Sequence, residues 1–152
     1  MLKNNILIKY TIRKAKPEDL ATLDRIHTEN MKGYVEKIYP WNATLFRDSF
    51  IPDEYTIIEI QSNIVGFTKI VTTATEIYLA EIQIRSHYQN RGIGSSLIHS
   101  VIKQAEDNPK RYHRRLWLKV IKGNPAQKLY QRLGFMVFEE SPTHLKMAKN
   151  LA

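Results

Sequence analysis

The 152-residue chain contains no cysteine. This absence excludes a disulfide scaffold, thiolate catalysis and a zinc site built from cysteine ligands. The chain also lacks any apolar run close to the roughly 20 residues that a membrane-spanning helix needs. Residues 1–10 have neither the long apolar segment nor the small-residue cleavage site of a signal peptide. We therefore expect a cytoplasmic protein with no membrane partner.

Acidic residues are few relative to basic ones. The sequence has 15 Asp and Glu against 23 Lys and Arg, a formal net charge of +8. Such a surface attracts polyanions, including nucleic acids and phosphorylated cofactors. No recognised DNA- or RNA-binding motif is present, so we expect no specific nucleic-acid partner, and a basic nucleic-acid-binding module stays an alternative. No spacing of His, Asp and Glu indicates a metal site.

Three strand-like runs occupy the middle of the chain. Residues 55–60, 64–72 and 77–84 are rich in β-branched side chains and are separated by short breaks. This pattern predicts an antiparallel meander. Gly66 lies inside the second run, where a glycine often marks the close passage of another backbone.

Helical segments flank these strands. Pro17 and the two acids after it are typical of a helix start, and apolar residues follow at spacings of three and four. We expect Gly33 to interrupt this helix, with shorter helices near 34–38 and 43–50. Another amphipathic helix begins after the meander, and the proline of the Asn-Pro pair at 108–109 should end it.

The order of the predicted elements is β-α-α-β-β-β-α-β-α-β-β. This order predicts an α/β layered fold, a mixed sheet of about six to seven strands flanked by helices on both faces. The strand–helix–strand unit in its centre should be parallel. With 43% hydrophobic residues, we expect one domain spanning residues 1–152.

A glycine-containing turn joins the third strand of the meander to the next helix. Its sequence is Gln-Asn-Arg-Gly-Ile-Gly at 89–94. At such a turn, unpaired backbone N–H groups and the positive end of the helix dipole converge, which predicts a phosphate site. A dinucleotide fold would need a third glycine and an acid downstream, and a P-loop would need Gly-Lys-Ser/Thr. Neither pattern occurs.

A second motif follows about 30 residues later. It consists of Asn-Pro-Ala at 124–126, Leu-Tyr at 129–130 and Leu-Gly-Phe at 133–135. Together with the turn at 89–94, it resembles the GNAT superfamily of acetyl-CoA-dependent N-acetyltransferases. The turn matches the Gln/Arg-x-x-Gly-x-Gly/Ala signature of that family, and the two motifs span about 77–137.

This resemblance implies an activity and a cofactor site. Acetyl-CoA would donate its acetyl group directly to a primary amine of a small molecule or a peptide. The sheet would splay in its centre, and the pantetheine arm would bind to exposed backbone of the strand that ends at Ile84. Backbone N–H groups of the turn would bind the pyrophosphate. The implied cofactor-binding residues are Ile82, Gln83, Ile84, Gln89, Asn90, Arg91, Gly92, Ile93, Gly94, Ser95, Asn124, Ala126 and Tyr130.

The resemblance also implies a catalytic acid. Tyr130 would protonate the departing thiolate, and its alternative role is that of a core aromatic residue. Asn124 would reach the pantetheine or the acetyl end. It is equally suited to cap the helix that begins after Pro125.

The general base is where the sequence departs from the family. Positions that carry a base in some members correspond here to Tyr78, Ala80 and Lys119. Glu81 is the nearest acid and our candidate, followed by Glu76 and by a water molecule. Strand alternation places Glu81 on the face opposite Ala80 unless a β-bulge intervenes. Without a base, the chain would be an acetyl-CoA-binding sensor.

The acceptor site is expected between the N-terminal helices and the closing strands. Aromatic residues there suit a small amine, an amino-acid derivative or a peptide N-terminus. A homodimer remains open. The residues of this region are His27, Met31, Tyr34, Tyr39 and Trp41, with His144 opposite.

Overall fold

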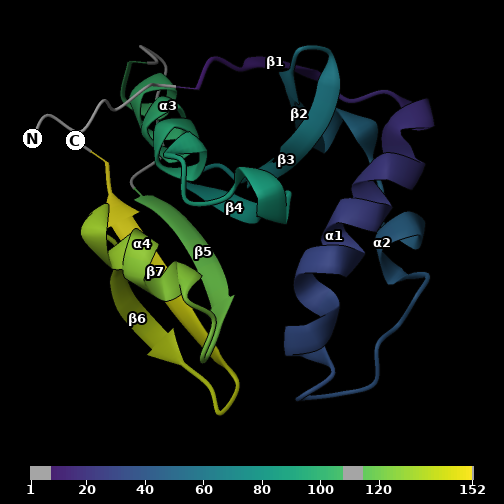
Figure 1. Ribbon diagram of the computed structural model, residues 1–152. Coiled ribbons are helices and arrows are strands. Elements are labelled where there is room, and N and C mark those ends of the chain that lie inside the picture. Colours follow the sequence, from purple (N-terminus) through teal and green to yellow (C-terminus); the bar gives the residue numbers. More distant parts are fainter. Residues whose placement is uncertain (1–7, 108–114, 152) are drawn as a thin grey trace, which may run out of the picture.

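The computed structural model describes residues 8–107 and 115–151, and a seven-stranded mixed sheet forms its centre (Figure 1). The strand order is β1-β2-β3-β4-β5-β7-β6, and among the described strands only β4 and β5 pair in parallel. The predicted meander and the predicted parallel unit are thus both confirmed. The strands are β1 (Thr11–Lys14), β2 (Tyr55–Ile60), β3 (Asn63–Thr72), β4 (Glu76–Ile84), β5 (Arg115–Ile121), β6 (Met136–Glu140) and β7 (His144–Asn150).

Helices cover both faces of the sheet. Ile57 packs in a cluster with residues of α1 and α2, whereas Ile58 packs with the first turns of α3. Successive residues of a strand point to opposite faces, so α1 and α3 lie on opposite sides. None of the helices within the described ranges is long and apolar enough to cross a membrane. The helices are α1 (Leu20–Val35), α2 (Leu45–Asp48), α3 (Ile93–Asp107) and α4 (Ala126–Arg132).

The sheet opens between its two parallel strands. β4 and β5 pair only from Glu76 to Tyr78, opposite residues 115–117. Beyond this point the strands diverge, and Figure 1 shows α1 and α2 on one side of the opening and α4, β6 and β7 on the other. The predicted central splay is therefore present. In the described part of the chain, the backbone of β4 beyond Tyr78 has no strand partner on its β5 side.

A β-bulge lies in the splayed part of β4. Leu79 pairs with Ile70 and Glu81 pairs with Lys69, so Ala80 is an extra residue with no partner on β3. A bulge shifts the alternation of side chains by one position. The Glu81 side chain therefore points to the face of the sheet opposite to the one that unbroken alternation predicts for it.

The same strand pair explains Gly66. A Cβ atom at this position would lie 2.4 Å from the backbone oxygen of Gln83 on β4. The predicted close passage of another backbone is thus confirmed, and a larger residue here would push β3 from β4.

Two local predictions were wrong. Gly33 does not interrupt α1, which continues to Val35, because the packing of the helix on β3 and β4 outweighs the cost of one glycine of about 1 kcal/mol. No separate helix forms at 34–38, because residues 34–35 still belong to α1 and the chain turns at 36–38. The helix expected at 43–50 is present in a shorter form as α2. The helix stop predicted at 108–109 lies outside the described residues.

Candidate active site

One continuous pocket of about 1140 Å³ runs along the opening of the sheet. Its wall includes the start of α3, the splayed part of β4, the end of β5, α4, one face of α1 and residues 39–42. Pockets for single small ligands measure roughly 300–1,000 Å³. This pocket therefore has room for a long ligand together with a second molecule.

One end of the pocket is formed by the start of α3. Gly92 has a φ of 86° and Asn90 a φ of 61°, both left-handed. The first helical hydrogen bond runs from Ser96 N to Gly92 O (3.0 Å). Among the described residues, the backbone N–H groups of 90–95 donate to no protein acceptor. Free donors at the positive end of a fifteen-residue helix suit a phosphate.

Most predicted cofactor-binding residues line this pocket. The exception is Arg91, whose guanidinium lies over the Tyr88 ring at 5.8 Å from its centroid. Their role in cofactor binding stays a prediction. The lining residues are Ile82, Gln83, Ile84, Gln89, Asn90, Gly92, Ile93, Gly94, Ser95, Asn124, Ala126 and Tyr130.

Beyond the helix start, the pocket follows the free edge of β4. Arg85 N donates to Val65 O on β3 (2.8 Å). Antiparallel ladders alternate, so the backbone of Gln83 also faces β3, whereas Ile82 and Ile84 face the opening. These two residues can offer backbone groups to an extended ligand, as the resemblance implies. Gln83 also lines the pocket and is 8% exposed, and its predicted role in cofactor binding stays a prediction.

The carbonyl of Ile84 is already engaged. It accepts hydrogen bonds from Asn30 Nδ2 (2.9 Å) and Gln89 Nε2 (2.8 Å). The side chain of Gln89 therefore ties the turn before α3 to the end of β4. Ile82 and the N–H of Ile84 remain for a ligand.

Tyr130 projects from α4 into the middle of the pocket wall. The residue is 7% exposed. Burial, together with the charge of Glu81, raises the pKa of Tyr130 to about 12. No described residue hydrogen-bonds to its hydroxyl, which stays protonated at neutral pH. Tyr130 thus packs in the core, as the alternative prediction had it, while its hydroxyl keeps a proton to donate.

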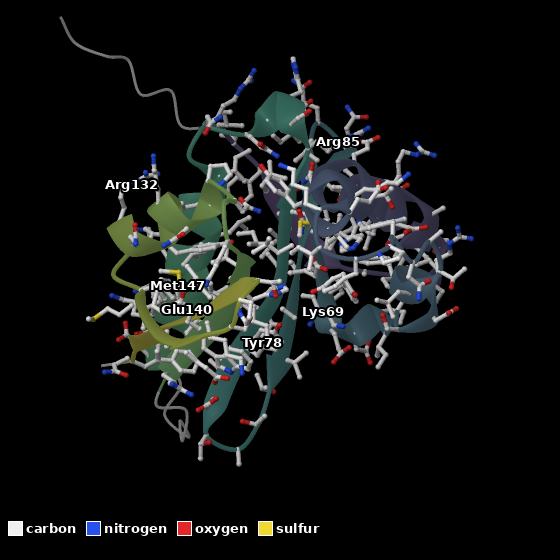
Figure 2. All side chains as sticks on the ribbon, turned by 90° about the horizontal axis from the view of Figure 1, so that it is seen from below. Lys69, Tyr78, Arg85, Arg132, Glu140 and Met147 are labelled. Carbon is white, nitrogen blue, oxygen red and sulfur yellow. The ribbon has the colours of Figure 1, made fainter. Side chains whose placement is uncertain are left out.

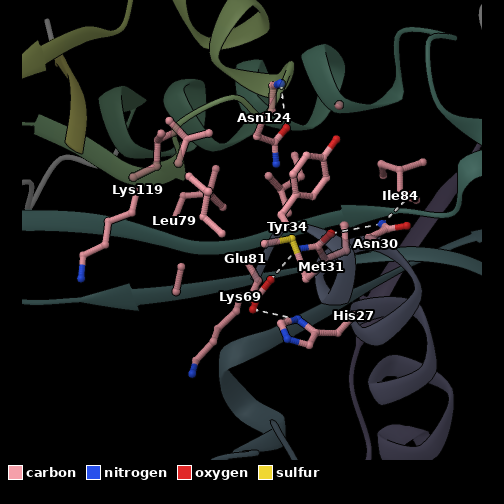
Figure 3. A pocket seen from close by; sticks show the side chains of 18 of the residues that line it. His27, Asn30, Met31, Tyr34, Lys69, Leu79, Glu81, Ile84, Lys119 and Asn124 are labelled. Carbon is pink, nitrogen blue, oxygen red and sulfur yellow. Dashed lines mark hydrogen bonds and ion pairs between the residues drawn. The ribbon is translucent and has the colours of Figure 1, made fainter. Parts of the chain in front are cut away.

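Asn124 has the predicted capping role, and its predicted contact with the cofactor stays a prediction. Its Oδ1 accepts a hydrogen bond from Ala126 N (2.9 Å) at the start of α4. Figure 3 shows the side-chain nitrogen of Asn124 pointing into the pocket. The capping interaction fixes the rotamer and leaves the amide N–H groups for a ligand.

The other end of the pocket contains a carboxylate. The bulge at Ala80 turns Glu81 toward α1, where its Oε1 lies 3.1 Å from His27 Nδ1. Its Oε2 accepts a hydrogen bond from Gln83 Nε2 (2.7 Å). Glu76, the second candidate base, does not line the pocket and instead pairs with Arg115 at 2.8 Å.

The positions that some family members use for a base have other contacts here. The Tyr78 ring stacks on Trp117, with centroids 4.0 Å apart and an interplanar angle of 11°. Burial, followed by the charge of Glu81, raises the pKa of Tyr78, so it remains neutral. In Figure 2, Tyr78 lies in projection between Met147 on the β7 side and Lys69 on the β3 side.

Aromatic residues surround the carboxylate end. The His27 ring stacks on Phe46 at 4.8 Å and lies 5.6 Å from the Trp41 ring. On the opposite wall, His144 Nδ1 lies 2.7 Å from Thr143 Oγ1. Burial and the charge of Lys119 lower the pKa of His144, in that order. The residues expected at an acceptor site, namely His27, Met31, Tyr34, Tyr39, Trp41 and His144, all line the pocket.

Sequence patterns missed the contacts of His27 and Asn30. Both belong to α1, and their partners on β4 lie more than 50 positions later in the chain. The only local signal is their spacing of three residues, which places them on one helix face. Within residues 8–107 and 115–151, no cluster of His, Asp and Glu is arranged to hold a metal ion.

A helix start with free N–H groups, joined by a free strand edge to an aromatic site, is the arrangement expected from the resemblance to acyltransferases that use a coenzyme A thioester. The comparison with protein families agrees. Residues 14–135 match the Acetyltransferase (GNAT) family, and the chain belongs to this family. It is an acyltransferase whose acetyl donor is acetyl-CoA.

Individual proteins resemble the chain in sequence or in structure. The chain is 26% identical over 159 residues to an uncharacterised N-acetyltransferase of Methanocaldococcus jannaschii, covering 97% of this chain and 70% of that protein. The solved structure of the PaiA N-acetyltransferase of Thermoplasma acidophilum, in complex with coenzyme A, has a TM-score of 0.77 and 21% identity, covering 93% and 99% of the two chains. The ribosomal-protein-S18-alanine N-acetyltransferase of Escherichia coli has a TM-score of 0.69 and 23% identity, covering 95% of each.

Proposed function

We propose that the protein transfers the acetyl group of acetyl-CoA to a primary amine of a small molecule or a peptide by direct attack. The observation that carries this proposal is the continuity of the pocket. It joins the free N–H groups at the start of α3 to the aromatic end beside α1. Both substrates can therefore be bound at once, which direct transfer without an acyl-enzyme requires. The absence of cysteine agrees with such a route.

The residues in the middle of the pocket suit the two proton transfers. Tyr130 gives its proton to the leaving thiolate. The residue lines the pocket, and its hydroxyl makes no hydrogen bond to a described residue, which supports this role. Glu81 supplies the carboxylate that serves as the general base for the acceptor amine. Its position in the pocket supports catalysis over the alternative of a non-catalytic sensor, which was motivated by the absence of a conventional base. A backbone N–H near Ile82 would stabilise the developing oxyanion, an effect of about 3–4 kcal/mol in a dry site.

The acceptor occupies the aromatic end of the pocket. Tyr34, Tyr39 and Trp41 form its wall, and Glu81 lies beside them. A carboxylate among aromatic rings favours a protonated amine with an apolar neighbour. A protein amine is one such acceptor, since a neighbour of the same fold acts on an alanine of a ribosomal protein.

The test is thiol release. Protein and acetyl-CoA are mixed with a panel of small amines, amino-acid amides and short peptides, and the freed coenzyme A thiol is titrated. Release with at least one amine, matched by an acetylated product of the expected mass, supports the proposal. Tight coenzyme A binding by calorimetry without thiol release over the whole panel contradicts it.

A further inference from the structure

The contact between His27 and Glu81 joins α1 to the bulge of β4. The two side chains are 17% and 18% exposed, and His27 Nδ1 lies 3.1 Å from Glu81 Oε1 (Figure 3). Among the described residues, this nitrogen is the one buried side-chain N or O atom without a geometrically satisfied hydrogen bond. A buried ring nitrogen this close to a carboxylate oxygen costs stability unless the nitrogen carries a proton, because two lone pairs repel each other. The contact therefore indicates a proton on Nδ1.

The carboxylate in this contact is fixed by a chain of amides. Glu81 Oε2 accepts a hydrogen bond from Gln83 Nε2 at 2.7 Å. Gln83 Oε1 in turn accepts one from Asn30 Nδ2 at 3.1 Å. Asn30 is one helical turn after His27, so α1 contributes to both ends of this network. Both oxygens of Glu81 thus face protein groups, and neither points freely toward an acceptor.

The imidazole is held in a fixed plane. Phe46 stacks on one side of the ring at an angle of 29°, and Trp41 lies beside it. The Nε2 atom of His27 makes no hydrogen bond to a described residue and, unlike Nδ1, is not buried. It is the polar atom of the His27–Glu81 pair that has no partner among the described residues, and His27 lines the pocket.

Other charges near this imidazole are already paired. Asp24 on α1 accepts a hydrogen bond from Arg47 Nε of α2 (2.9 Å). The Lys69 ammonium on β3 lies 4.0 Å from the Glu54 carboxylate. Glu81 is therefore the charge that acts on the ring most directly.

Two tyrosines of the neighbouring strands carry no charge. Burial is the main cause that raises the pKa of Tyr55 on β2 and of Tyr78 on β4. Both hydroxyls therefore stay protonated over the pH range in which imidazoles titrate.

We propose that the base of this enzyme is the His27–Glu81 pair rather than Glu81 alone. Glu81 holds the neutral ring with its proton on Nδ1, and Nε2 takes a proton from the acceptor ammonium. This inference rests on the proposed function and adds His27 as a catalytic residue with Glu81 as its positioning residue. A nucleophile's base oriented by a third group is a recurring arrangement in enzymes.

The proton balance of acetyl transfer defines which proton the His27–Glu81 pair must accept. An ammonium acceptor must lose one proton before attack, and the N–H electron pair becomes the lone pair that forms the C–N bond. That proton moves to Nε2 and then to solvent. As the C–S bond breaks, the thiolate takes the hydroxyl proton of Tyr130. The second proton lost from the amine nitrogen then reprotonates Tyr130. One proton is therefore released per turnover, through the open side of His27.

The first test reads the tautomer and needs no turnover. Protein with nitrogen-15 in its imidazoles is measured by two-bond proton–nitrogen correlation at about pH 9, where histidines are neutral. We expect the His27 signals to show the proton on Nδ1, and Glu81→Gln to abolish this preference. A proton on Nε2, or a pattern unchanged in Glu81→Gln, would overturn the pairing.

The second test separates catalysis from packing. At pH 7, His27→Gln should lower kcat by a factor on the order of 100. The deficit should shrink at about pH 10, where a lysine-like amine loses its own proton. His99→Gln, an exposed substitution on α3 outside the pocket, is the matched control and should behave as wild type. A deficit that is equal at every pH would show a structural role and contradict the proposal.

Folding and binding controls complete the design. The coenzyme A affinity of His27→Gln should match that of wild type, because the residue lies away from the start of α3. The melting temperature should fall, because the ring contacts and the partner of Glu81 are lost, so rates are compared at temperatures where both proteins are folded. If the wild-type protein acetylates no amine, the proposed function fails, whereas the tautomer still decides whether the pair exists.

Discussion

The two ends of the pocket are built from different parts of the chain. At the start of α3, the donors are backbone N–H groups of consecutive residues, and two left-handed residues set their direction. At the acceptor end, the polar groups are side chains of α1 and β4 that are brought together from distant positions. One end depends on local backbone geometry, and the other depends on tertiary packing.

This difference predicts how each end responds to mutation. A backbone site tolerates changes of side chain but not changes of φ, whereas a side-chain site responds to the loss of single functional groups. Substitutions at the first end should change coenzyme A affinity. Substitutions at the second end should change acceptor affinity or the rate of transfer.

The largest effect is expected where the two ends meet. Tyr130→Phe removes the hydroxyl and keeps the ring that packs in the core. Loss of a general acid lowers kcat by a factor of roughly 10²–10⁴. We expect coenzyme A affinity and melting temperature to stay close to wild type. Steady-state thiol release and calorimetry measure these quantities, and transfer at the wild-type rate would refute the acid assignment.

The same comparison explains what the sequence predicts well. The turn at 89–94 and the segment at 124–135 are each contiguous, and their glycines and proline act on the backbone nearby. Alternation and β-branched runs likewise predicted all three strands of the meander, because each depends on residues next to one another. These parts of the fold and of the cofactor end were therefore predictable.

The acceptor end was predicted only as a region. The bulge at Ala80 follows from the register of β3 against β4, and no periodicity in β4 alone marks an extra residue. The contact of His27 with Glu81 depends on that bulge and on how α1 packs. Gly33 was misread for a related reason, since tertiary packing sustains α1 beyond it.

A change of backbone tests the cofactor end. Gly92 has a φ of 86°, and a left-handed conformation costs a residue with a Cβ about 1–2 kcal/mol. Gly92→Ala should therefore weaken coenzyme A binding by about tenfold, with kcat for bound substrates nearly unchanged. Gly33→Ala is the matched control, because its Cβ would meet nothing within 4 Å in a helix. Calorimetry showing equal affinities for both variants would contradict a backbone-built site.

Lowering the pH tests the Arg13–Asp19 contact, which holds the start of the helix that carries part of the acceptor end. Arg13 donates two hydrogen bonds to Asp19 (2.9 and 3.0 Å) just before α1. This contact is the main cause that lowers the pKa of Asp19, against the opposing effect of burial. Its stabilising effect is present above the unfolded value of about 3.9 and disappears as the pH falls through the lowered folded value.

Asp19→Asn should therefore cost about 1–2 kcal/mol at pH 7 and much less in strong acid, where the wild type has lost the same contact. Urea unfolding at both pH values measures the difference. Asp48→Asn, an exposed substitution on α2, should change neither value. A cost that is independent of pH would show that Asp19 acts through packing.

The smallest effect is expected at the aromatic wall. Trp41 lies beside the His27 ring and lines the acceptor end of the pocket. Trp41→Leu keeps an apolar side chain and loses an aromatic contact of roughly 0.5–1.5 kcal/mol. The KM for the best amine of the panel should rise by about fivefold, and the KM for acetyl-CoA should not change. Gly92→Ala should give the reverse pattern, so the two variants together separate the ends of the pocket. Equal changes in both KM values for Trp41→Leu would show that the two ends are coupled, because a substitution at the acceptor end would then also change the binding of acetyl-CoA.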